Sequence, residues 1–202
     1  MKLQNYIVEE EKGLAHYIPK IQAECKPFLK DIKNAAGTLF RDDTKNRNKP
    51  VWKKTTRMDR APLDSSLDFH KQADDLFLKK FGWKARSQGL FCWPLPFKSS
   101  FLANKWMVFP AGNYKYLWSP AISDLWGDVG MNWEDTDYAI FELEESYLNT
   151  YKTDKIKMSI KHENEIMIQC KYSYLVKSEL MEPINEALGL NWQGAVFKGR
   201  KI

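Results

Sequence analysis

Apolar residues recur at three- and four-residue steps in several stretches of the chain, and this spacing places them on one face of an α-helix. The expected helices cover residues 17–35, 65–80, 134–152 and 179–188. Glycines that stop a helix follow three of these segments, at Gly37, Gly82 and Gly189. Pro27 is expected to kink the first helix, because proline cannot donate the backbone hydrogen bond of a helix interior.

Aromatic and branched residues, punctuated by proline and glycine, predict strands in the middle of the chain. The expected segments are 89–93, 105–109 and 113–119, preceded by a short strand at 38–40 that ends in Arg41. The resulting order is helix, strand, helix, several strands, helix, strand, helix. It predicts an α+β fold with an N-terminal helical segment at 1–36 and one domain at 37–202.

The stretch KHENEIMIQCKYSYLV, residues 161–176, carries the longest alternation of apolar and polar positions. Alternate side chains of a strand point to opposite faces, so the pattern predicts one strand with an apolar face. Glu163 and Glu165 are expected side by side at the start of its other face. Two like charges so placed are unfavourable unless the protein uses them.

Composition narrows the class of protein. The chain has 202 residues, is 44% hydrophobic and has no apolar run long enough for a transmembrane helix. Its N-terminus has the pattern of neither a signal nor a transit peptide. Three cysteines without paired spacing indicate buried thiols in a reducing compartment, so a cytoplasmic protein is expected. The three histidines lack metal-ligand spacing, so no metal is expected.

A basic stretch interrupts the balance of charge between residues 45 and 60. It contains one acid, Asp59, and seven basic residues: Lys45, Arg47, Lys49, Lys53, Lys54, Arg57 and Arg60. Such a segment could bind the phosphates of a nucleotide or a nucleic acid, or form a solvated loop. The overlapping sequence RMDRAPLD, residues 57–64, could be an ion-pair network or a specialised site; its charged residues are Arg57, Asp59, Arg60 and Asp64.

Three features follow one another along the chain. Arg41 stands at the end of an early strand, RSQGLFCW (residues 86–93) opens a central strand, and Glu163-Asn164-Glu165 leads into a late strand. This order resembles the arginine–serine–glutamate branch of the ADP-ribosyltransferase superfamily. The resemblance implies a split β-sheet core with flanking helices. The middle motif departs from the family pattern, because Cys92 and Trp93 stand where small hydroxyl residues are usual.

The resemblance also implies roles for individual residues. Glu165 would stabilise the oxocarbenium-like ribose as nicotinamide leaves, and Glu163 would meet the acceptor. Arg41 would hold the diphosphate of NAD with its planar fork. Ser87 would be the serine of the middle motif, and Phe91 or Trp93 would form a wall for the nicotinamide. Arg41 could instead form a salt bridge with Asp42 or Asp43. The rings of Phe91 and Trp93 could instead belong to the hydrophobic core.

The expected function is therefore transfer of ADP-ribose from NAD to a macromolecule, with NAD as substrate and without a metal. A protein is the expected acceptor rather than a nucleic acid, and the accepting group stays open between an arginine side chain, another residue and a base. Three alternatives stay open: an NAD glycohydrolase, an inactive relative with this fold, and a non-enzymatic nucleic-acid-binding or structural protein that uses residues 45–60.

Overall fold

The computed structural model describes residues 2–44, 48–62, 65–94, 105–132, 135–190 and 192, with side chains from residue 13 onward. Within these ranges the chain forms eight α-helices and two antiparallel sheets, so the predicted α+β class is confirmed. Backbone contacts divide the chain into two units. Unit 1 comprises residues 1–55, 94–114 and 170–202, and unit 2 comprises residues 56–93 and 115–169.

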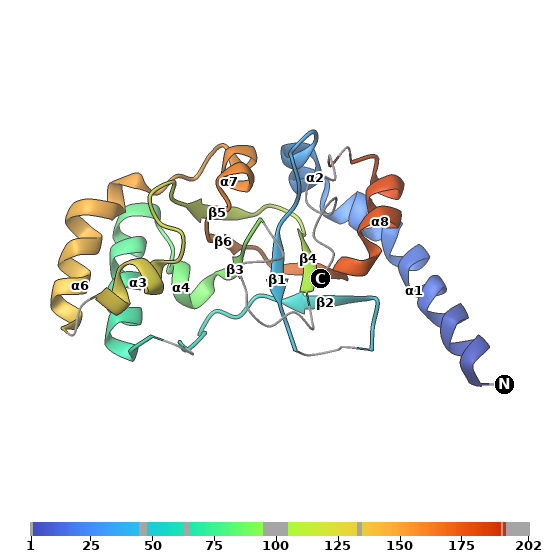
Figure 1. Cartoon of the computed structure of the whole chain (residues 1–202), viewed down its shortest axis with the longest axis horizontal. Helices are drawn as coiled ribbons and strands as arrows, with labels where there is room; N and C mark the ends of the chain where they lie inside the picture. Colours follow the sequence, from blue (N-terminus) through green and yellow to red (C-terminus); the bar gives the residue numbers. More distant parts are fainter. Residues whose placement is uncertain are drawn as a thin grey trace, which may run out of the picture. The chain divides into compact units, whose positions relative to one another are not determined.

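Unit 1 contains the four-stranded sheet, in the order β1-β4-β7-β2 (Figure 1). Its strands are β1 (Phe40–Asp42), β2 (Val51–Thr55), β4 (Lys105–Pro110) and β7 (Tyr172–Lys177). Its helices are α1 (Lys2–Glu24), α2 (Lys26–Ile32) and α8 (Met181–Leu188), the last preceded by a 3₁₀ turn at Ser178–Leu180. The single helix expected at 17–35 is thus two helices that meet at Cys25, with proline in the first turn of α2.

The basic stretch 45–60 is not one loop, because residues 51–55 form strand β2 and pair with β7. Lys54 bonds the buried carboxylate of Asp43, and the Lys53 ammonium lies 3.4 Å from the centre of the Tyr172 ring. Lys45 and Arg47 lie outside the described residues. Two of the cations expected to meet phosphates therefore have partners within unit 1.

Unit 2 contains the three-stranded sheet, in the order β3-β6-β5. Its strands are β3 (Leu90–Cys92), β5 (Lys115–Trp118) and β6 (Ile166–Gln169). Its helices are α3 (Leu67–Phe81), α4 (Ala85–Gln88), α5 (Leu125–Asp128), α6 (Thr136–Glu142) and α7 (Ile156–His162). A 3₁₀ turn at Gly130–Asn132, a π-helical turn at Leu143–Tyr147 and a 3₁₀ turn at Leu148–Thr150 complete it.

Helix α3 forms where the sequence predicts it. The Ser66 hydroxyl accepts a hydrogen bond from the Phe69 backbone N–H at 3.1 Å, which caps the first turn. Gly82 ends the helix at φ +75°, a left-handed conformation that glycine adopts without steric cost. The buried face carries Phe69, Ala73 and Phe77 into the core of unit 2.

Within the described ranges, no helix is long and apolar enough to cross a membrane.

The prediction of one strand across residues 161–176 is wrong. Strand β6 ends at Gln169 and strand β7 begins at Tyr172, and the two strands belong to different sheets. Both faces of β6 are covered, since Ile166, Met167 and Ile168 are all buried. The apparent alternation was produced by two separate strands joined at residues 170–171.

Candidate active site

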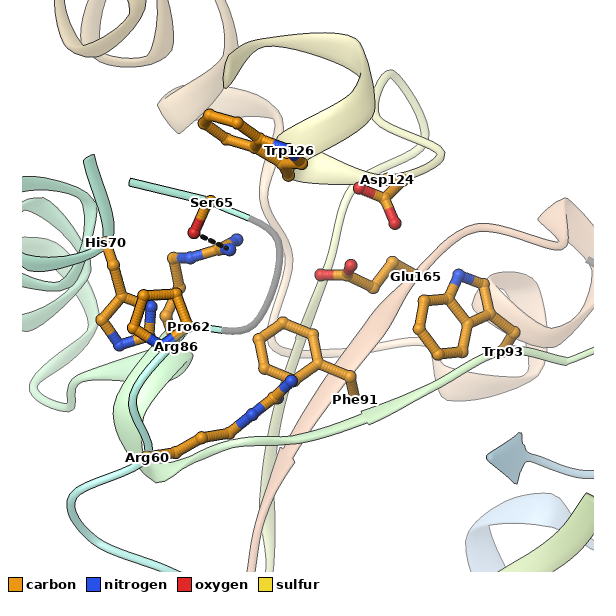
Figure 2. Close-up of a pocket in the computed structure, with 10 residues that line it drawn as sticks. All are labelled: Arg60, Pro62, Ser65, His70, Arg86, Phe91, Trp93, Asp124, Trp126 and Glu165. Atoms are coloured by element: carbon orange, nitrogen blue, oxygen red, sulfur yellow. Dashed lines mark hydrogen bonds between the residues drawn. The ribbon is translucent and has the colours of Figure 1, made fainter. Parts of the chain in front are cut away.

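A cavity of about 130 Å³ lies within unit 2. Its lining combines two arginines, two carboxyl groups and three large aromatic rings: Arg60, Arg86, Asp124, Glu165, Phe91, Trp93 and Trp126. Pro62, Ser65 and His70 complete it (Figure 2). The convergence of charged and aromatic groups on one small space is typical of a ligand-binding site.

Glu165 is the residue immediately before β6, and it contributes to the lining of the cavity. Ile166 pairs with Cys92 of β3, which places Glu165 and Trp93 together at the end of the paired strands. The Glu165 backbone N–H donates to the Ser123 carbonyl at 2.9 Å, and the Asn164 side chain donates to the Ser119 carbonyl at 2.8 Å. These bonds fix the turn that carries the carboxyl group.

The Glu165 carboxyl is buried, with 7% of the residue exposed. The pKa of Glu165 is raised to about 8, chiefly by burial and also by the negative charges of Asp124 and Asp128, while the positive charges of Arg86 and Arg60 oppose the rise. A carboxyl group that titrates near neutral pH can change its protonation state when a charged ligand arrives. Strongly shifted groups of this kind concentrate at functional sites.

Arg86 supplies a buried cation to the cavity from helix α4, and 7% of the residue is exposed. Its guanidinium Nη2 donates to the Ser65 hydroxyl at a long 3.4 Å, and its Nε has no hydrogen-bond partner among the described residues. A buried guanidinium with an unused donor is costly unless a ligand satisfies it. Arg86 therefore marks this part of the cavity as a site for an anionic or acceptor group.

Asp74 of α3 holds the start of α4 in place. Its carboxylate accepts the backbone N–H groups of Arg86 at 2.7 Å and Ser87 at 3.1 Å, and it also bonds the Ser87 hydroxyl. Gly89 follows α4, where a Cβ would lie 2.1 Å from the Ala85 carbonyl oxygen, so the chain can turn into β3 only without a side chain. Together these features set the position of Arg86.

His70, Asp74 and Ser87 are close together, but their hydrogen bonds are not those of a nucleophilic triad. The Ser87 hydroxyl donates to Asp74, and burial lowers the pKa of His70, so the neutral ring donates its Nε2–H to Ser87 Oγ at 3.0 Å. In a triad the histidine would accept the serine proton instead. The cluster therefore positions α4 rather than activating Ser87.

Arg60 and Phe91 form a second contact in the lining. The guanidinium carbon of Arg60 lies 4.1 Å from the centre of the Phe91 ring, and that of Arg86 lies 5.6 Å from it. The Arg60 backbone N–H donates to the Ser87 carbonyl at 3.1 Å. The Phe91 ring is therefore in contact with an arginine, and Trp93 and Trp126 are the other two aromatic rings of the lining.

The structure brings only some of the predicted site residues together. Glu165, Phe91 and Trp93 line the cavity. Ser87 is not part of the lining, although it contacts His70, which is. Arg41 belongs to β1 of unit 1, where its Nε lies 3.8 Å from the Asp43 carboxylate, as in the competing salt-bridge interpretation.

Glu163 does not share a strand face with Glu165, so that prediction is wrong. It caps the C-terminus of α7 in the left-handed conformation, with φ +61° and ψ 18°. Its side chain is not part of the cavity lining. The two acids are therefore not paired on one strand face, which was the ground for expecting Glu163 to meet the acceptor beside Glu165.

Replacing Glu163 with glycine is expected to stabilise the protein by about 0.5–1 kcal/mol, because a left-handed cap strains any residue with a Cβ. Thermal unfolding measures the change. The cavity should function as before, since Glu163 is not in its lining. A destabilised variant would show instead that the Glu163 side chain makes a contact worth more than the strain.

Sequence reasoning missed three charged residues of the cavity: Arg60, Arg86 and Asp124. Arg60 lies in the RMDRAPLD stretch, for which the sequence leaves more than one role open. Arg86 directly precedes Ser87, the residue expected to be the serine of the middle motif. No local pattern marked Asp124. Within the described ranges, no group of three or more His, Cys, Asp or Glu side chains could hold a metal ion.

Comparison of the chain with protein-family models, with curated proteins and with solved structures gave no match. The function is therefore inferred from the geometry and chemistry of the cavity, together with the order of motifs along the sequence.

Proposed function

We propose that the protein cleaves NAD between nicotinamide and ribose and transfers the ADP-ribosyl group to a macromolecular acceptor. The observation that supports this most is the position of Glu165, buried in a cavity with two arginines and two tryptophans. The motif order of the sequence resembles the ADP-ribosyltransferases. The cavity adds the residue types that their reaction needs, in one unit of the fold.

The chemistry explains the need for a buried carboxylate. Nicotinamide leaves with the electron pair of the C1′–N bond, and positive charge moves onto the ribose. An ionised carboxylate in a site shielded from water stabilises this charge far better than one in water. The pKa of Glu165 is about 8 in the free protein, and a cationic nicotinamide ring beside it favours the ionised form.

The size of the cavity also fits part of NAD. An engineered cavity of roughly 150 Å³ holds one benzene molecule. The present volume of about 130 Å³ thus has room for about one six-membered ring, with Trp93 and Trp126 as aromatic walls. The rest of the dinucleotide must lie outside this volume. Arg60 and Arg86 supply cations for its phosphates.

The test is to incubate the purified protein and a cell lysate with NAD that is labelled in the adenylate part. Free nicotinamide and labelled macromolecules are then measured in the same sample. Release of nicotinamide with labelled macromolecules supports transfer. Release with free ADP-ribose alone would identify an NAD glycohydrolase, and no release at all would refute the proposal.

Arg86 is expected to contribute to NAD affinity, so Arg86→Lys should weaken binding by about 10- to 100-fold, the value of a charged hydrogen bond. Lysine keeps the charge but loses the planar fork of donors. Calorimetric titration with NAD measures the effect. Arg41→Lys is the matched control. This variant should leave the affinity for NAD unchanged, because Arg41 lies beside Asp43 in unit 1. If Arg41→Lys weakened NAD binding and Arg86→Lys did not, Arg41 would be the residue that holds the diphosphate.

A further inference from the structure

A second carboxyl group shares the cavity with Glu165. Figure 2 shows the carboxyl groups of Asp124 and Glu165 directed into the same space, from the loop before α5 and the residue before β6. The backbone hydrogen bond from Glu165 N–H to the Ser123 carbonyl, 2.9 Å long, joins the two segments beside these side chains. The two acids are therefore held together by the fold, unlike Glu163 and Glu165.

The position of Asp124 is fixed by a cap. Its carboxylate accepts the Gly127 backbone N–H at 2.9 Å and so caps the first turn of α5. Asparagine caps a helix equally well, so the cap does not require a charge. A charge at this point even disfavours ionisation of Glu165. The negative charge of Asp124 thus has a cost that the local structure does not explain.

The cavity also contains an independent sign of a ligand. The Nε of the buried Arg86 has no hydrogen-bond partner among the described residues, although the residue lines the same space as both acids. Two carboxyl groups with different environments, one buried and one partly exposed, are the usual arrangement where a glycosidic bond is cleaved and a nucleophile is activated.

We propose that Asp124 is the base on the acceptor side of this site and removes the proton of the incoming nucleophile. The inference rests on the proposed cleavage of NAD. As the C1′–N bond breaks, its electron pair leaves with nicotinamide. A lone pair of the acceptor forms the new bond to C1′, and the acceptor proton moves to the Asp124 carboxylate and then to solvent. Glu165 stabilises the ribose cation throughout.

The substitution Asp124→Asn keeps the cap and removes the base. General bases typically contribute 10²–10⁴-fold, so release of nicotinamide with water as acceptor should fall by at least about tenfold. Azide is a nucleophile with no proton to lose. Adding azide should restore release in Asp124→Asn to within about threefold of the wild type and yield ADP-ribosyl azide. Glu165→Gln should not be restored by azide, because bond cleavage itself is impaired.

A second readout tests whether the charge of Asp124 acts on Glu165. The charges that act on Glu165 are those of Asp124, Asp128, Arg86 and Arg60, and the buried Tyr151 phenol lies in the same field. Removing the Asp124 charge should lower the pKa of Glu165, so the acidic limb of the kcat/KM profile should shift to lower pH. This shift reports the charge of Asp124 beside Glu165, whereas restoration by azide reports its role as a base.

The outcomes separate the two claims. A wild-type protein that releases no nicotinamide overturns the proposed function, and the role of Asp124 falls with it. A wild-type protein that is active while Asp124→Asn is equally active leaves the function standing and overturns the role of Asp124. The role is also overturned if Asp124→Asn loses activity that azide does not restore.

Discussion

Replacing Glu165 with glutamine is expected to slow the release of nicotinamide from NAD by about 10²–10³-fold. Glutamine preserves the shape of the side chain but cannot carry the negative charge that balances the ribose cation. The loss should appear mainly in kcat, because the charge matters most in the transition state. Glu163→Gln is the matched control, since it makes the same chemical change two residues away and outside the cavity lining.

The same substitution should make the protein more stable at alkaline pH. Folding raises the pKa of Glu165 from 4.5 to about 8, so the folded state binds a proton that the unfolded state has lost between these values. The contribution of Glu165 to stability is therefore fully present below about pH 4.5 and is lost as pH rises to about 8. Glutamine does not titrate.

The free energy of unfolding of Glu165→Gln should exceed that of the wild type by about 3–5 kcal/mol at pH 8 and above, with the gap closing toward pH 4–5. Denaturant titration across this range measures it. Lower activity together with greater stability is the pattern expected when the wild-type residue serves function but lowers the free energy of unfolding. A variant that loses activity and stability in parallel would show that Glu165 is structural.

Asp74→Ala is expected to reduce the free energy of unfolding by about 3–5 kcal/mol, the largest loss of stability that we predict. Asp74 is 1% exposed and accepts hydrogen bonds from the backbone N–H groups of Arg86 and Ser87 and from the Ser87 hydroxyl. Removing the carboxylate leaves buried donors without acceptors. Because these bonds place Arg86 in the cavity, NAD affinity should fall as well.

Asp75→Ala is the control for this substitution. Asp75 is the next residue of α3, and its exposed carboxylate forms a surface ion pair with Lys84 at 3.3 Å. Such pairs contribute about 0–1 kcal/mol, so Asp75→Ala should change stability little. Denaturant titration of both variants gives the comparison. Equal, small losses would mean that water replaces the Asp74 carboxylate, and the proposed positioning of α4 would be wrong.

The parts of the fold that sequence predicts well are those that local chemistry decides. Helix α3 has the apolar stripe and the left-handed glycine stop at Gly82 that the sequence predicts, and the Ser66 hydroxyl caps its first turn. The described part of the helix expected at 134–152, which begins at residue 135, and residues 179–188 are likewise mostly helical. The strand at 51–55 was missed because three polar residues in a basic stretch conceal its pairing with β7.

The site was harder to predict because long-range contacts decide which residues meet. Alternation continued through residues 170–171 although the chain there leaves one sheet for another. Arg41 and Arg86 each stand beside a predicted strand, and only the tertiary structure shows that Arg86 lines the cavity with Glu165. Asp124 enters the same cavity from a loop that carries no sequence signal. Glu165 was identified because its motif is local.

The most direct test of the account is the pH dependence of nicotinamide release from NAD by the purified wild-type protein. The active form of Glu165 is the carboxylate, and kcat/KM reports the pKa of the free protein. We expect kcat/KM to rise about tenfold per pH unit and to level off near pH 8, with this limb absent in Glu165→Gln. No release at any pH, or a wild-type kcat/KM that does not change between pH 6 and pH 9, would contradict it.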